Sequence, residues 1–299
     1  MMNKRIQLMA CIAIIGLLIT HCTNETKSGF AEVNGTRLYY EIAGNGTPLI
    51  FHHGFTCDHR NWNPQIEYFA DRYQVITYDA RGHGQSEVPD SIPYSYVEDL
   101  AALIDYLEID KAVIIGHSLG GAPAFYYTKD HPERVLALIL AEGGAFLSDP
   151  AIVDTSNIPS YFNELYSAIA VARNQGLEDG KIAWLKIHPM NDAAENPISS
   201  DLLNTMIEDY SGWHWLNEDP QKSNPIGTIE MMRSIKTPTL IVAGEYSHPV
   251  LKDLVFAQSQ YIPNSKLVTI GKSNHMLNIE NPDQFNKELE SFLLENEIK

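Results

Sequence analysis

Basic residues are scarce in this chain of 299 residues, which carries 21 Lys and Arg against 38 Asp and Glu. The formal net charge is -17, and no cluster of Lys or Arg offsets it locally. Such a surface repels phosphate backbones, so the composition excludes a nucleic-acid-binding protein. The hydrophobic fraction of 44% excludes a disordered chain, because a chain of this length and content can bury a large core.

Cysteine is also rare, and cofactor-binding patterns are missing. The three cysteines lie far from any His and Cys cluster of the kind that binds zinc: Cys11, Cys22 and Cys57. Neither G-x-G-x-x-G nor G-x-x-x-x-G-K occurs, so no nucleotide cofactor is indicated. His52 and His53 are adjacent, which points them to opposite faces of an expected strand and argues against a shared metal. We therefore expect neither a metal nor a cofactor.

The apolar run at the N-terminus is too short to cross a bilayer. Residues 6–19 are apolar apart from Gln7 and follow Lys4 and Arg5, whereas a spanning helix needs roughly 20 apolar residues. This pattern predicts a signal peptide over residues 1–21. Its end resembles a bacterial lipoprotein signal, which implies lipidation of Cys22; an uncleaved anchor is the alternative. We expect a polar tether over 22–29 and an exported protein, periplasmic or membrane-anchored through this end.

Strand-like and helix-like segments alternate through most of the remaining chain. Asn34-Gly35 is a strong hairpin signal between residues 30–33 and 37–42. Further strands are expected at residues 49–52, 74–78, 112–115, 135–140, 239–243 and 266–270. Helices are expected at residues 62–69, 96–107, 120–130, 250–261 and 282–296. Several strands are unbroken apolar runs, which indicates burial on both faces. The fold class is therefore α/β, with a mostly parallel sheet covered by helices.

One segment interrupts this alternation. Residues 146–233 contain no strand-like run, and helical patterns occur at 161–175 and 199–210. We predict a helical cap inserted into a core domain formed by residues 30–145 and 234–299. Three of the four tryptophans fall in the cap and are predicted to contact substrate: Trp184, Trp213 and Trp215. The alternative is an insertion whose aromatic residues form only its own small core.

A nucleophile motif stands in the context that it requires. Gly116-His117-Ser118-Leu119-Gly120 matches G-x-S-x-G, follows an apolar strand and precedes a helical pattern. A turn this tight brings neighbouring backbones close, so side chains at either flanking glycine would clash. The turn exposes the hydroxyl of Ser118, the predicted nucleophile. A free hydroxyl needs a base, and His275, in a short polar loop after the last strand, is best placed. We interpret His117 as a packing residue.

These motifs together resemble the α/β-hydrolase superfamily over about residues 30–298. The resemblance is carried by His53-Gly54-Phe55, by Tyr78-Asp79-Ala80-Arg81-Gly82-His83-Gly84-Gln85-Ser86, by the motif around Ser118, and by His275 ahead of Glu280-Asn281-Pro282. It implies an α/β-hydrolase fold with a helical cap and chemistry based on a serine and a histidine. It also implies an oxyanion hole formed by the backbone N–H groups of Phe55 and Leu119.

The third member of the catalytic triad departs from the commonest pattern. The usual aspartate position, after the strand at 239–243, is occupied by Ser247, which cannot balance a positive charge. Some superfamily members carry the acid one strand after the nucleophile, and Glu142 matches that position. We propose the order Ser118, Glu142, His275. Glu245 is the rival acid, and the third hypothesis is that neither carboxylate is the acid of the triad.

The resemblance implies a hydrolase that acts on a small-molecule carboxylic ester or lactone through an acyl-enzyme. A serine at the nucleophile position of the turn argues against dehalogenase and epoxide-hydrolase chemistry, which needs a carboxylate nucleophile. One alternative is hydrolysis of a carbon–carbon bond, or perhydrolysis, on the same fold. Another is a binding protein without turnover. The natural substrate, the acyl chain length and the oligomeric state do not follow from the sequence.

Overall fold

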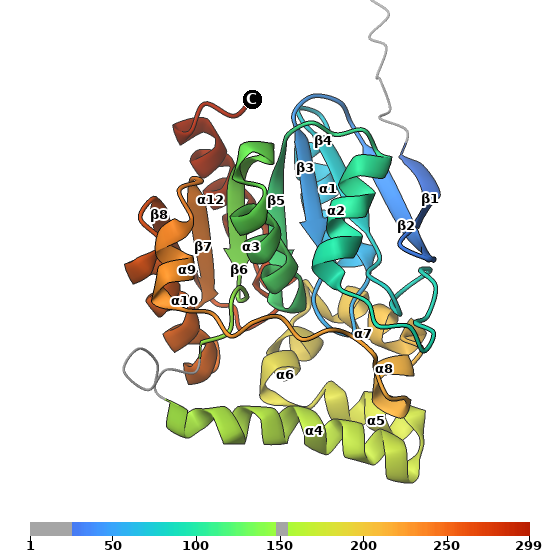
Figure 1. The fold of residues 1–299 in the computed structure, drawn as a ribbon. Coiled ribbons are helices and arrows are strands. Elements are labelled where there is room, and N and C mark those ends of the chain that lie inside the picture. Colours follow the sequence, from blue (N-terminus) through green and yellow to red (C-terminus); the bar gives the residue numbers. More distant parts are fainter. Residues whose placement is uncertain (1–25, 148–154) are drawn as a thin grey trace, which may run out of the picture.

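An eight-stranded sheet organises the part of the chain that the structure describes (Figure 1). The computed structural model describes residues 26–147 and 155–299. The predicted signal segment and the lipidation at Cys22 lie outside these residues. The strands are β1 (Lys27–Val33), β2 (Thr36–Ala43), β3 (Pro48–His52), β4 (Gln74–Tyr78), β5 (Ala112–His117), β6 (Val135–Ala141), β7 (Thr239–Gly244) and β8 (Ser265–Ile270). Every strand expected from the sequence is present, and bounds shift by only a few residues.

The sheet is antiparallel at one edge and parallel elsewhere. Its order is β1-β2-β4-β3-β5-β6-β7-β8, and only the β1–β2 and β2–β4 pairs are antiparallel. The hairpin turn at Asn34 and Gly35 has φ angles of 46° and 69°, the positive values that a two-residue hairpin requires. Lys27 already pairs with Ile42, so residues 27–29 belong to the sheet and not to the predicted tether.

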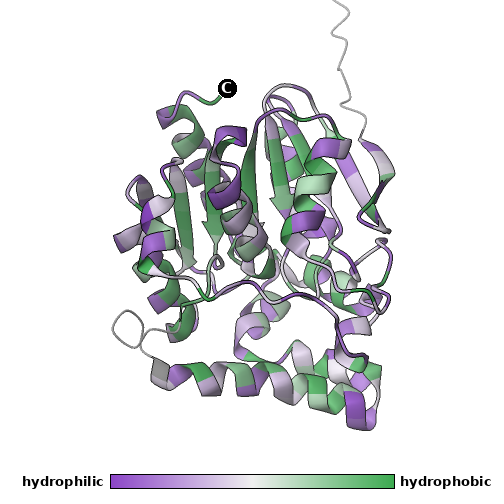
Figure 2. Cartoon of the chain, viewed as in Figure 1, coloured by the Kyte–Doolittle hydropathy of each residue, from purple (hydrophilic) through white to green (hydrophobic). Residues whose placement is uncertain are grey.

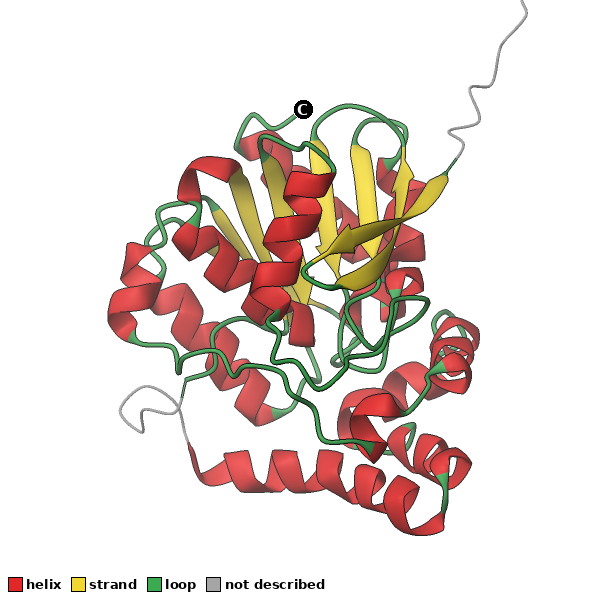
Figure 3. Cartoon of the chain, turned by 45° about the vertical axis from the view of Figure 1, so that its right-hand side comes forward, coloured by secondary structure: helices red, strands yellow, loops and turns green. Residues whose placement is uncertain are grey.

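Helices cover both faces of the sheet (Figure 3). The helices of the core domain are α1 (Asn63–Phe69), α2 (Tyr96–Tyr106), α3 (Gly121–Asp130), α9 (Ile229–Ser234), α10 (Pro249–Tyr261), α11 (Leu277–Glu280) and α12 (Pro282–Glu295). Strand residues alternate between two buried cores: Ile114 packs with α2, α3 and α10, whereas Ile115 packs with α1 and α12. This alternation explains the unbroken apolar strands, which Figure 2 shows as green bands inside the sheet.

The insertion after β6 forms a helical cap below the carboxyl ends of the strands in Figure 1. It consists of α4 (Ile158–Gln175), α5 (Leu177–Trp184), α6 (His188–Glu195), α7 (Ser200–Asp209) and α8 (Trp213–Leu216). Trp184, Trp215 and Met206 form a core of its own, which Cys57 and Met276 of the core domain complete. The aromatic residues of the insertion therefore do not form only a core of its own, because the same apolar cluster fills the cap and docks it on the core domain.

A buried histidine joins the cap to the core domain. His214 in α8 lies 3.1 Å through its Nε2 from the Tyr96 hydroxyl and 3.2 Å through its Nδ1 from the Tyr210 hydroxyl. Its ring occupies the space beside Gly82, where a Cβ atom would lie 2.4 Å from His214 Cε1. Burial lowers the pKa of His214 to about 4, so the ring is neutral at pH 7.

Within residues 26–147 and 155–299, none of the helices combines the length and the hydropathy that a bilayer-spanning segment needs.

We expect stability to fall as the pH drops below about 6.5. Burial lowers the pKa of His52 and His117 to about 3 and that of His214 to about 4, from the usual 6.5. The unfolded chain therefore binds more protons than the folded one between these values. Each such histidine contributes a slope of up to about 1.4 kcal/mol per pH unit. Glu280, whose pKa burial raises to about 7, acts in the opposite direction as a single group.

Urea unfolding at pH 7.5, 6.5 and 5.5 measures this slope. The variant His214→Gln retains hydrogen-bonding capacity but does not titrate, so its unfolding free energy should depend less steeply on pH. A wild-type stability that is constant or rises between pH 6.5 and 5.5 would contradict the expectation.

Candidate active site

Ser118 sits on a sharp bend between a strand and a helix. It follows β5 directly and precedes α3, and its backbone φ of 50° lies in the left-handed region that non-glycine residues rarely adopt. A Cβ atom on Gly116 would lie 2.2 Å from Gly120 O, and one on Gly120 would lie 2.4 Å from His52 O. The two glycines of the motif are therefore required, because backbones meet at both positions. This confirms the steric argument made from the sequence.

His275 faces Ser118 from the loop between β8 and α11. Its Nε2 lies 2.8 Å from Ser118 Oγ, a normal hydrogen-bond distance. The histidine is buried, with 2% of its surface exposed. The two residues are 157 positions apart in the chain. The structure thus brings together a hydroxyl and a base in the geometry of an activated nucleophile.

Glu142 is the carboxylate that lies beside this histidine. It follows β6 and has a φ of 52°, so the bend after that strand is strained like the one at Ser118. Glu142 Oε2 lies 3.6 Å from His275 Nδ1. Both atoms are buried, and neither has a hydrogen-bond partner among the described residues. The separation is that of an ion pair slightly longer than a hydrogen bond, and such contacts often tighten only when substrate binds.

The rival acid points elsewhere. Glu245 is exposed, and its Oε2 accepts a hydrogen bond of 2.8 Å from the backbone N–H of Lys272. Ser247 is buried, and its hydroxyl donates to Glu142 Oε1 across 2.7 Å. The structure therefore places Glu142, and not Glu245, next to His275.

The loop after β3 lies against the nucleophile turn. A Cβ atom on Gly54 would lie 2.8 Å from His117 Nδ1 and 3.4 Å from Ser118 Cβ. This close approach places the next residue, Phe55, beside the turn. The backbone N–H of Phe55 follows Gly54 in this loop, and that of Leu119 directly follows Ser118 in the turn. Two backbone donors on loops that meet at Ser118 are what an oxyanion hole requires.

A small cavity opens over Ser118 and His275. It encloses about 340 Å³ of empty space, including the part that is open to solvent. The cap contributes Tyr161, Leu165, Trp184, Pro189 and Met190 to its wall, and Phe55 and Met276 come from the core domain. The lining is mostly apolar, so the cavity suits an apolar portion of a ligand.

The three cap tryptophans do not share one environment. Trp184 lines the cavity, but Trp213 and Trp215 do not. Trp215 is fully buried and packs against Trp184 with ring centroids 5.3 Å apart, so it supports the wall from behind. Trp213 packs against His214 at the junction with the core domain. Composition identified aromatic residues in the cap, but only the packing shows which ring reaches the cavity.

His117 does more than pack, which was the interpretation from the sequence. Its Nε2 lies 2.8 Å from the backbone carbonyl oxygen of His275. Burial lowers the pKa of His117 to about 3, so the neutral ring donates this hydrogen bond through Nε2. The residue next to Ser118 thus holds the backbone of His275. The motif G-H-S-L-G contains this histidine, yet nothing in its spacing indicates the distant partner.

The loop that carries His275 is also fastened from its other side. The backbone N–H of Asn274 donates to the Glu280 carboxylate, and the Asn274 side chain donates to His188 O of the cap across 2.8 Å. Glu280 is buried, which raises its pKa to about 7. These contacts link the loop of His275, the cap and α11, and no motif in the sequence indicated them.

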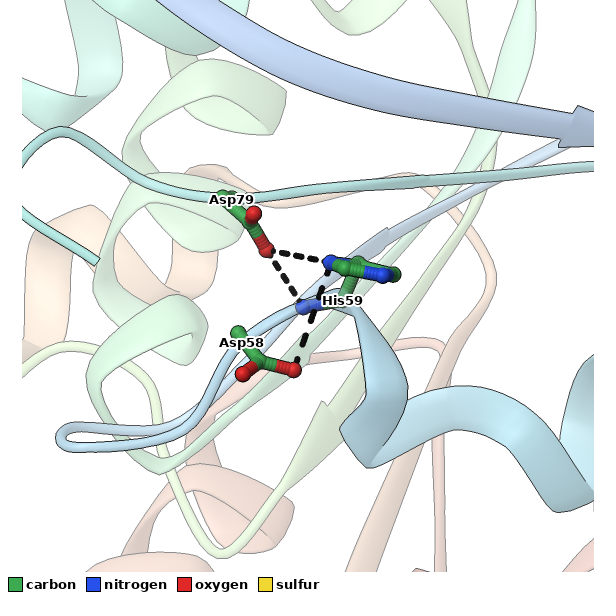
Figure 4. A group of neighbouring side chains, drawn as sticks. All are labelled: Asp58, His59 and Asp79. Atoms are coloured by element: carbon green, nitrogen blue, oxygen red, sulfur yellow. Dashed lines mark hydrogen bonds and ion pairs between the residues drawn. The ribbon is translucent and has the colours of Figure 1, made fainter. Parts of the chain in front are cut away.

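Figure 4 shows a second group of ionisable residues, Asp58, His59 and Asp79. One ligand-type atom from each of Asp58, His59 and Asp79 lies within 4.8 Å of the others. Asp79 Oδ1 accepts hydrogen bonds of 2.6 Å and 2.8 Å from the N–H and Nδ1 of His59. Arg60 pairs with Asp58 across 2.6 Å. Although burial opposes it, the hydrogen bond to Asp79 raises the pKa of His59. These side chains satisfy one another as ion pairs, which fits a structural role.

Known proteins resemble this chain over most of its length. The 3-oxoadipate enol-lactonase 1 of Acinetobacter baylyi is 27% identical over 275 residues, which is 91% of this chain and 94% of that protein. Est816, whose structure is described as that of an N-acyl homoserine lactone degrading enzyme, is 27% identical in sequence. The two structures superpose with a TM-score of 0.70 over 88% of this chain and 100% of the Est816 chain. Naproxen esterase from Bacillus subtilis shares the fold at 20% identity, with a TM-score of 0.74 over 91% of this chain and 92% of its own.

The family model described as alpha/beta hydrolase fold matches residues 47–282. This range runs from β3 to the start of α12 and includes the nucleophile turn, the cap and the loop of His275. The mostly parallel sheet, the bend at Ser118 and the inserted helices agree with this match. The chain therefore belongs to the alpha/beta hydrolase fold family.

Proposed function

We propose that this protein is a cofactor-free serine hydrolase that cleaves a carboxylic ester or a lactone. The observation that carries the proposal is the distance of 2.8 Å between Ser118 Oγ and His275 Nε2 on a strained turn that faces an apolar cavity. The similarity to an enol-lactonase and to a protein described as a lactone degrading enzyme supports this substrate class.

The reaction begins when Ser118 Oγ attacks the carbonyl carbon and its proton passes to His275 Nε2. The imidazolium that forms is balanced by the Glu142 carboxylate, 3.6 Å from Nδ1. Negative charge on the carbonyl oxygen is stabilised by the N–H groups of Phe55 and Leu119, and losing one such donor typically costs about 10²–10³ in rate. The intermediate collapses to an acyl-enzyme, and His275 gives its proton to the leaving alcohol oxygen.

Water then completes the cycle. His275 Nε2 removes a proton from the water as it attacks the acyl carbon, and returns that proton to Ser118 Oγ as the acid leaves. In a lactone the leaving oxygen remains joined to the acyl group, so a single hydroxy acid is released. The burial of His275 and Glu142 strengthens the electrostatic interaction between the two side chains, because little water screens it.

Removal of the nucleophile tests the proposal directly. The wild type should release a stoichiometric burst of p-nitrophenol from short-chain esters and react once with a fluorophosphonate. Ser118→Ala should lose the label and at least about 10⁴ of kcat, because triad members act as a unit. Turnover that survives in Ser118→Ala would refute the proposal, and failure to label the wild type would favour a binding protein.

The assignment of the acid is tested by a matched pair of variants. Glu142→Gln preserves shape and removes the charge, so kcat should fall by about 10²–10⁴ while the fold is kept. Glu245 is an exposed carboxylate that accepts a hydrogen bond from Lys272 N, so Glu245→Gln should retain kcat. Kinetics on one ester with both variants provide the measurement, and the reverse pattern would transfer the role to Glu245.

We also propose that the protein is exported and held at a membrane by a lipid on Cys22. The support is the charged start, the short apolar run of residues 6–19 and the cysteine that follows them. In a bacterial host fed radiolabelled palmitate, the wild type and Cys11→Ser should carry label and Cys22→Ser should not. Label that persists in Cys22→Ser, or is lost in Cys11→Ser, would contradict the assignment.

A further inference from the structure

Ser247 occupies the loop after β7, where the commonest arrangement of the superfamily has the acid of the triad. The side chain is buried, with 3% exposed, and its hydroxyl donates a 2.7 Å hydrogen bond to Glu142 Oε1. The backbone N–H of Gly244 donates to the same oxygen, also across 2.7 Å. Glu142 Oε1 therefore has two short donors, both supplied by the end of β7.

These two bonds determine where the second carboxylate oxygen lies. A carboxylate is planar, so fixing Oε1 leaves Oε2 facing His275 Nδ1 at 3.6 Å. Oε2 has no hydrogen-bond partner among the described residues, so nothing else on that oxygen orients the group. A glutamate has three rotatable side-chain bonds, and an anchor at its far end is needed to keep one orientation.

We propose that Ser247 is a positioning residue that holds the Glu142 carboxylate toward His275. This inference rests on the proposed function, in which Glu142 balances the charge that forms on His275. Ser247 does not touch the reacting atoms, and it acts through Glu142 alone. Its hydroxyl also suits an acid that has moved to β6, because an aspartate at 247 would place two carboxylates in one site, where they repel each other.

The proposal makes the contributions of residues 142 and 247 interdependent. Ser247→Ala should lower kcat by about tenfold with little change in KM, because a hydrogen bond to a charged group is lost and substrate contacts are kept. In the Glu142→Gln background the same change should cost almost nothing, since no carboxylate remains to be oriented. Ser247→Thr retains the hydroxyl and should recover most of kcat.

A matched control separates this effect from loss of a buried serine in general. Ser199 in the cap is fully buried and donates one 2.8 Å bond to Ala193 O, so Ser199→Ala should keep wild-type kcat. Thermal melting of every variant identifies any change that merely unfolds the protein. If Ser247→Ala does not fold, Ser247→Cys carries the test, because the thiol has a similar size but is a weak donor, and its kcat should fall as well.

The outcomes distinguish this inference from the function on which it rests. A kcat for Ser247→Ala within about twofold of wild type, or a loss that multiplies in full with that of Glu142→Gln, overturns the positioning role. The proposed function survives either result as long as Ser118→Ala is inactive. Wild-type turnover in Ser118→Ala overturns the proposed function instead, whatever the Ser247 variants do.

Discussion

The close approach of backbones around Ser118 is the constraint on which the other features of the site depend. Gly116 and Gly120 leave no room for a Cβ atom, because Gly120 O and His52 O occupy those positions. The turn can therefore remain tight, and the strained φ of Ser118 is maintained by its surroundings. The buried strands on either side supply the stability that offsets this strain. The hydroxyl lies at the carboxyl end of β5, where it meets the loop of His275.

The electrostatics of the site follow from which groups are buried with it. His117 is held neutral by burial and can serve as a fixed hydrogen-bond donor to the backbone of His275. Glu142 has two donors on one oxygen and the base on the other side. The carboxylate group of Glu142 thus faces His275, while the ring on the other side of the His275 backbone, that of His117, carries no charge. This arrangement favours the positive charge that the proposed reaction creates on His275.

The cap contributes part of the wall of the cavity and is linked to the loop of His275. Trp184 reaches the cavity, while Trp215 packs behind it and His214 docks against Gly82. Asn274 ties the loop of the base to the cap through His188 O. The same apolar cluster that holds the cap together also anchors it to the core domain, so the shape of the cavity and the position of the base are set by one packing arrangement.

The amino-acid sequence by itself determined the strands, the α/β class and the place of Ser118 on a turn after a buried strand, and it indicated His275 as the partner of that hydroxyl. Those features depend on local sequence patterns, namely the apolar runs that indicate buried strands, the turn signal at Asn34-Gly35 and the spacing of glycines around Ser118. Only the tertiary structure decided which carboxylate faces His275 and what orients it. The residues concerned end separate strands more than 100 positions apart, and a side chain's direction there depends on the strands packed beside it.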